Sequence, residues 1–99
     1  MSQSVYVTFV MNLKPDVTQG VCSAIAQALP DTRAFPGCRG VRVLRNEVDP
    51  NKILLLQEWD SREDHEKYWA WRNRDGTMDG LANMLTTPTQ PEYWPIVIA

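Results

Sequence analysis

One stretch of fourteen residues, Trp59–Arg72, concentrates the side chains of this sequence that could do chemistry. It holds the single histidine and three of the four tryptophans. Four of its side chains recur at i, i+3, i+4 and i+7 and so share one helix face: His65, Tyr68, Trp69 and Arg72. The imidazole of His65 has an ordinary pKa suited to a general base near neutral pH. Arg72, two turns further on, could hold an anionic oxygen, and Tyr68 could donate a hydrogen bond to it.

Aromatic side chains in the same stretch could form the walls of a binding site. Trp59, Trp69 and Trp71 present large flat surfaces that suit a ring-shaped ligand. Trp69 and Trp71 lie on opposite margins of the helical face, so both cannot point to its centre. Asn12, at the end of the first predicted strand, could donate a hydrogen bond to a substrate oxygen or cap the following turn.

Each of these residues also has a purely structural interpretation. His65 lies among acidic residues in the first turns of the predicted helix and would then be solvated. Tyr68 and Trp69 at helical spacing are typical of a hydrophobic core. Arg72 would form an ion pair at the surface or at an interface. Geometry decides between the two interpretations.

The composition limits the classes of protein to which the chain can belong. Its 99 residues correspond to one domain. A net charge of −2 without a basic patch argues against nucleic acid as a partner. The apolar runs are too short for a membrane span and no secretory signal is visible, so we expect a cytoplasmic protein. Cys22 and Cys38 are expected to be reduced thiols, and one histidine without a carboxylate in ligand register argues against a closed zinc site.

Hydrophobic periodicity predicts four strands, two main helices and one short helix. A strand over Val5–Met11 is followed by a helix that begins at Pro15. We expect Pro30 to stop that helix, because the residue before a proline is pushed out of the α region. Asp60, with Glu63 as a capping box, or Ser61 would begin the second helix. The remaining predicted elements are strands over Val41–Arg45, Ile53–Trp59 and Tyr93–Ile98 and a short helix over Met78–Leu85.

The order of these elements predicts an α+β, ferredoxin-like fold, β-α-β-β-α-β, whose four-stranded antiparallel sheet carries both helices on one face. The first and third strands are apolar on both faces, and a bare apolar sheet face is unusual on a monomer. We therefore expect a homodimer whose sheets pack face to face. Glu58 alternates with Trp59, so if Trp59 faces the helices, Glu58 enters the dimer interface and needs a partner such as Arg42 or Arg45.

Several motifs resemble those of the antibiotic-biosynthesis monooxygenase domain, part of the dimeric α+β barrel superfamily. They are Phe35–Gly40, Glu58–Glu63, Tyr68–Arg72 with Gly76 and Leu81, and Pro91–Trp94. The resemblance covers nearly the whole chain. It implies the dimeric α+β barrel fold and adds Phe35 to the expected substrate-binding residues. The family includes cofactor-free oxygenases that act on quinols and polyketide phenols, haem-degrading enzymes, and members with no known activity.

Two hypotheses from different classes follow. The first is a homodimeric, cofactor-independent monooxygenase that oxidises a hydroquinone-like or polyphenolic small molecule with O2. In it His65 is the base or anchor, Arg72 and Tyr68 are donors, and the tryptophans are walls. The second is a non-catalytic, dimeric ligand-binding or stress-response protein on the same scaffold. Haem degradation would need His65 as iron ligand, but His65 falls early in its helix, whereas haem-degrading members carry the ligand near the C-terminal end of that helix.

Overall fold

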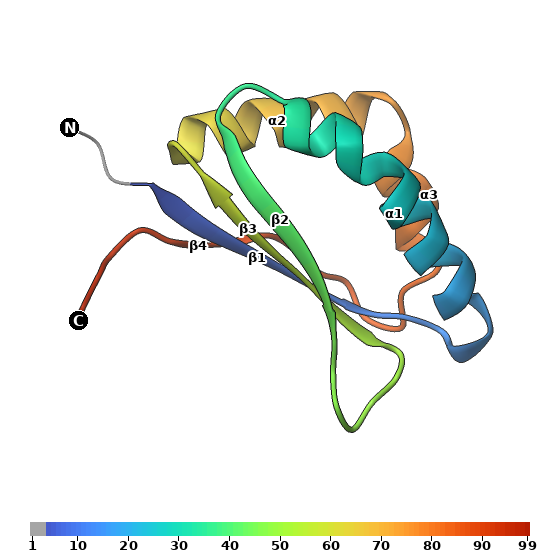
Figure 1. Cartoon of the computed structure of the whole chain (residues 1–99). Helices are drawn as coiled ribbons and strands as arrows, with labels where there is room; N and C mark the ends of the chain where they lie inside the picture. Colours follow the sequence, from blue (N-terminus) through green and yellow to red (C-terminus); the bar gives the residue numbers. More distant parts are fainter. Residues whose placement is uncertain (1–3) are drawn as a thin grey trace.

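The computed structural model describes residues 4–99 and contains one four-stranded antiparallel sheet with its helices packed on one face (Figure 1). The strand order is β2-β3-β1-β4. The predicted α+β, ferredoxin-like fold is confirmed. The elements are β1 (Val5–Asn12), a 3-10 turn (Pro15–Val17), α1 (Thr18–Ala34), β2 (Cys38–Arg45), β3 (Lys52–Trp59), α2 (Arg62–Arg74), α3 (Thr77–Ala82) and β4 (Glu92–Trp94).

The register of the two central strands decides which side chains the helices cover. β1 and β3 pair antiparallel, with Val7 opposite Gln57 and Phe9 opposite Leu55. Because side chains alternate along a strand, these residues share the helix-facing side of the sheet. Trp59 lies on this side as well and is fully buried. The covered face is therefore apolar except for Gln57, which is the only polar residue in this part of the two central strands, 53–59 and 5–11, to be buried there.

The opposite face of the sheet has no helix over it. Alternation places Tyr6, Val10, Leu54 and Leu56 on this side. Glu58 lies there as predicted, but its partners within residues 4–99 are the Ser4 hydroxyl at 2.7 Å and Arg39 at 4.0 Å, rather than Arg42 or Arg45.

α2 begins at one of the two predicted caps. The Ser61 hydroxyl accepts a hydrogen bond from the backbone N–H of Asp64 at 3.1 Å and satisfies one unpaired donor of the first turn. Asp60 instead accepts a hydrogen bond from Arg39 at 2.6 Å. The cap fixes where α2 starts and hence which of its side chains face the sheet.

Two predicted element boundaries are wrong. α1 continues through Pro30 to Ala34, because contacts at its C-terminal end outweigh the backbone hydrogen bond that a proline cannot make. The last strand was predicted to reach Ile98, but only Glu92–Trp94 pairs with β1. The next residue, Pro95, has no backbone N–H with which to continue the ladder. Within residues 4–99 no helix has the length and apolar character needed to cross a membrane.

Candidate functional site

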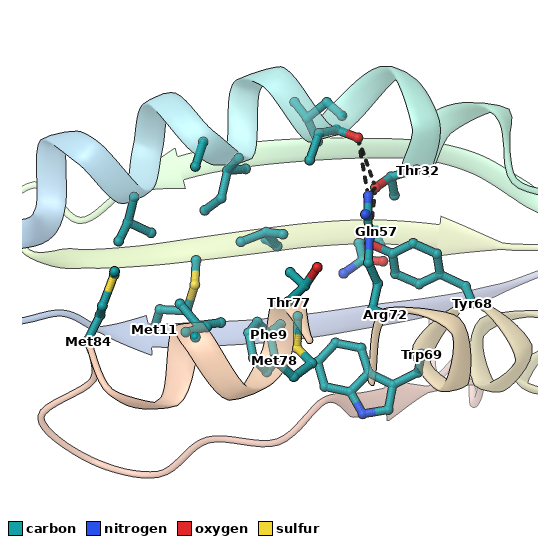
Figure 2. A pocket seen from close by; sticks show the side chains of 18 of the residues that line it. Phe9, Met11, Thr32, Gln57, Tyr68, Trp69, Arg72, Thr77, Met78 and Met84 are labelled. Atoms are coloured by element: carbon teal, nitrogen blue, oxygen red, sulfur yellow. Dashed lines mark hydrogen bonds between the residues drawn. The ribbon is translucent and has the colours of Figure 1, made fainter. Parts of the chain in front are cut away.

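A cavity of about 300 Å³ lies between α1, the sheet and the α2–α3 region (Figure 2). Helix α1 contributes small and aliphatic side chains, β1 and β3 contribute Phe9, Met11 and Leu55, and α3 with the turn after it contributes methionines. An apolar cavity of this size matches a small aromatic or aliphatic ligand. Its polar side chains are few and are Thr32, Gln57, Tyr68, Arg72 and Thr77.

Arg72 is the polar anchor of this cavity. It comes from the last turns of α2, and only 7% of it is exposed. Its Nε donates to the Tyr68 hydroxyl at 3.0 Å, and one Nη donates to the Thr32 hydroxyl at 2.9 Å and to the Ala28 carbonyl at 3.3 Å. Figure 2 shows the guanidinium between α1 and Tyr68, beside Gln57. The side chain is therefore held in one orientation by neutral acceptors.

The positive charge of Arg72 has little compensation. Among residues 4–99 its salt-bridge partner is Asp75, at 3.6 Å and partly exposed. Hydrogen bonds from the Thr77 side chain and backbone, and to a smaller extent the charge of Arg72, hold the pKa of Asp75 below its ordinary value. The guanidinium also lies 4.4 Å from the Trp71 ring centroid, a cation–π distance. A buried cation with one long ionic contact favours an anion in the cavity next to it.

Gln57 adds a directed amide to the same wall. Its Oε1 accepts a hydrogen bond from the Trp59 indole N–H at 2.9 Å, which identifies the amide nitrogen as the end that remains. Gln57 lines the cavity, and its amide nitrogen has no hydrogen-bond partner within residues 4–99. A ligand oxygen near Arg72 could therefore accept from Gln57 as well.

His65 lies behind the cavity and does not line it. Its side chain is fully buried, its ring stacks on Trp69 at 5.8 Å between centroids, and Nδ1 lies 2.8 Å from the Tyr93 hydroxyl. Its Nε2 has no hydrogen-bond partner among the described residues. Desolvation by burial lowers the pKa of His65 to about 4, so the ring is neutral at pH 7.

The other predicted site residues are distributed around this centre. Tyr68 and Trp69 line the cavity, whereas Trp59, Trp71 and Phe35 form an aromatic cluster next to it. Phe35 stacks on Trp71 at 5.5 Å and meets Trp59 edge-on at 6.1 Å. These three residues support Tyr68 and Arg72 from behind and do not line the cavity.

Asn12 lies at the far end of β1 and does not line the cavity. Its amide donates to the Thr87 hydroxyl at 3.4 Å, and its carbonyl accepts from the Thr86 backbone N–H at 2.8 Å. Asn12 therefore ties the segment after α3 to the sheet.

Sequence reasoning missed two polar residues of the site. Thr32 was assigned to a loop because the first helix was expected to end at Pro30. Its spacing of seven from Ile25 and four from Ala28 continues the helical stripe and could have indicated the same face. Gln57 alternates with Leu55 and Trp59, so the strand period alone indicates a polar group on the covered face.

No curated protein sequence shows significant similarity to this chain. Several solved structures share its fold. A conserved protein from Methanosarcina mazei Go1 has a TM-score of 0.85 and 16% identity, over 95% of this chain and 93% of that one. Rv0793 from Mycobacterium tuberculosis has a TM-score of 0.84 and 18% identity, over 98% of each chain. A Nitrosomonas europaea protein provisionally named antibiotic biosynthesis monooxygenase has a TM-score of 0.80 and 17% identity, over 99% and 94%.

At these identities the similarity to solved structures establishes the fold. The family is established separately, by sequence. The model of the antibiotic biosynthesis monooxygenase family matches residues 4–76, which include β1 to α2 and every residue of the Arg72 anchor. Because this match covers well over half of the sequence, the chain belongs to the antibiotic biosynthesis monooxygenase family.

Proposed function

We propose that this protein is a cofactor-independent monooxygenase that oxidises a quinol or polyphenolic small molecule with O2 in the cavity beside Arg72. The observation that carries the proposal is a buried guanidinium, held by neutral acceptors and facing an apolar cavity. A phenolate satisfies both features, because its oxygen takes the charge and its ring takes the apolar wall.

The proposed chemistry needs no base inside the cavity. The charge of Arg72 favours the ionised form of a phenol, whose proton passes to solvent as the ligand binds. The electron-rich anion then reduces O2, with all four electrons taken from the substrate. In the simplest case a CH2 group becomes a carbonyl and the second oxygen atom leaves as water, CH2 + O2 → C=O + H2O. Arg72 and Gln57 hold the oxygen on which negative charge develops, and the apolar lining keeps bulk water out.

The test is oxygen uptake with a panel of quinols and phenols. Replacing Arg72 by Gln should lower kcat/KM about 10- to 100-fold, because a charge-assisted hydrogen bond is lost. Arg74→Gln, on the same helix but exposed, is the matched control and should leave the rate unchanged. Equal rates for Arg72→Gln and the control would contradict the proposal.

A second experiment separates this mechanism from one in which His65 is the base. His65→Phe keeps an aromatic ring in the buried site. Because His65 is neutral and does not line the cavity, we expect kcat/KM to stay within about threefold of wild type and to keep its pH profile above pH 6. A loss of a hundredfold or more, with the folded structure intact, would restore His65 as the general base.

A non-catalytic ligand-binding protein is the second candidate. One observation favours it: within residues 4–99 the titratable side chains that line the cavity are Tyr68 and Arg72, and neither is a base at pH 7. Calorimetric titration with the same phenols distinguishes the two. Binding that depends on Arg72 without any oxygen uptake would favour this candidate over the enzyme.

A further inference from the structure

A second cavity, of about 510 Å³, lies against the first. Both cavities are lined by the same four residues, Phe9, Trp69, Met78 and Leu81. A side chain that lines two cavities must lie between them, so the wall is one side chain thick. A ligand larger than the first cavity would extend through this wall.

The two cavities differ in chemistry. The first is apolar around one cation, whereas the second carries hydroxyl and amide groups from Asn73, Thr86, Thr87, Thr89 and Gln90. Its charged side chain, within residues 4–99, is the exposed Asp79. Neutral hydroxyls match such a surface, because they can both donate to and accept from these groups. A carboxylate or phosphate does not match it, because Asp79 repels it and no cation compensates.

The wall has a fixed half and an adjustable half. Phe9 and Trp69 pack edge to face at 5.1 Å on β1 and α2. Figure 2 shows the Trp69 indole nitrogen directed away from α1 and Arg72, and no described residue accepts a hydrogen bond from it. Met78 and Leu81 belong to α3, a six-residue helix. An unbranched methionine changes rotamer readily, so Met78 is the side chain best able to yield to a ligand.

The adjustable half also lies outside the part of the chain that the family shares. The family match ends at residue 76, where Gly76 takes a left-handed conformation and begins α3. The segment is tied down again by Lys14, whose backbone N–H donates to the Met84 carbonyl at 2.9 Å, and by the pairing of Leu13 with Leu85. The second cavity is therefore built mainly by residues beyond the family match.

We propose that the two cavities are subsites of one elongated site and that the ligand is an aromatic phenol carrying a neutral, hydroxyl-rich substituent such as a sugar. The phenolic part lies in the first cavity against Arg72, and this half of the inference rests on the proposed function. The sugar lies in the second cavity, among its hydroxyl and amide groups. Asp79 and Met78 are then specificity-determining residues.

Three ligands test the proposal by calorimetry: a dihydroxynaphthalene, its monoglucoside and its monoglucuronide, which share one phenolic core. The glucoside should bind wild-type protein about tenfold more tightly than the aglycone, and the glucuronide about tenfold more weakly than the glucoside. Asp79→Asn should remove most of the discrimination against the glucuronide and leave aglycone affinity unchanged. Asp16→Asn, exposed and far along the chain, is the matched control.

The outcomes separate this inference from the proposed function. Equal affinity for glucoside and aglycone, or discrimination that Asp79→Asn does not alter, would overturn the sugar subsite and leave the phenol site standing. Glucoside binding that depends on Asp79 but not on Arg72 would support the subsite and contradict the phenolate anchor. Absence of binding by all three ligands would overturn both.

Discussion

Arg72 and His65 occupy the same face of α2, and burial has opposite effects on their charge. The guanidinium keeps its charge because hydroxyl and carbonyl oxygens accept from it. The imidazole has one partner, the Tyr93 hydroxyl, and burial lowers its pKa to about 4. At pH 7 the face therefore presents one cation and one neutral ring. This is why the proposed chemistry relies on anion binding rather than on a buried base.

The buried His65 should make the stability of the protein depend on pH. Its folded-state pKa of about 4 lies below its ordinary value of 6.5, so between these values the unfolded chain binds a proton that the folded chain does not. The free energy of unfolding should then fall as pH drops from about 6.5 to about 4, by about 3 kcal/mol. Urea unfolding at several pH values measures it. His65→Phe should lose this component of the slope, and an unchanged slope would contradict the shift.

The Tyr68 hydroxyl joins α1 to α2. It accepts from Arg72 Nε at 3.0 Å and lies 3.0 Å from the Thr32 hydroxyl, both in the buried interior. Tyr68→Phe keeps the ring but leaves Arg72 short of an acceptor, so we expect a loss of about 1–3 kcal/mol in urea unfolding. Tyr6→Phe, on an exposed tyrosine, should change stability by less than about 0.5 kcal/mol. A similar loss in both variants would show that the contact is not the cause.

At the scale of elements, the turn between α1 and β2 packs closely on the first turn of α2. Gly37 has φ of +91°, and a Cβ there would lie 2.6 Å from the Asp64 Cβ and Cγ. Gly76 has a similar φ of +85° but open space around it. Gly76→Ala should therefore cost only the backbone term, about 1–2 kcal/mol. Gly37→Ala adds the clash and should cost at least about 2 kcal/mol more in denaturant unfolding. Equal losses would mean that the turn moves freely.

Local patterns predicted most of these elements and missed those that tertiary contacts decide. The apolar periods of β1, β3 and α2 give the sheet and the helix face directly. The end of α1 could not be predicted, because a sequence does not show that Arg72 donates to the Ala28 carbonyl and the Thr32 hydroxyl across the cavity. That contact holds the helix beyond Pro30.

The same distinction applies to the site. Helical spacing placed Tyr68, Trp69 and Arg72 on one face, and they line the cavity together. His65 shares their spacing but lies about two turns before Arg72, where Trp59 and Tyr93 enclose it. Spacing along a helix identifies a face, but not how far a cavity extends beneath it. The partner strand β4 decides that for His65.

At the scale of the whole molecule, the uncovered sheet face is apolar along its centre. Leu54 pairs with Val10 on one side and Leu44 on the other, and this row lies on the face opposite the helices. Trp94 adds to it by donating a hydrogen bond to the Thr8 hydroxyl at 2.8 Å. Tyr6 and Trp94 are 49% and 55% exposed, so large apolar surfaces remain in contact with water in the single chain.

The predicted homodimer buries this row between two sheets, and it stays a prediction that sedimentation can test. Wild-type protein should sediment as a dimer at micromolar concentration. Leu54→Lys places two like charges at the centre of a twofold interface, so it should shift the protein to monomer. Val48→Lys, in the exposed β2–β3 hairpin away from the sheet face, should leave the dimer intact. A wild-type monomer would rule out the interface, and a Leu54→Lys dimer would place it elsewhere on the molecule.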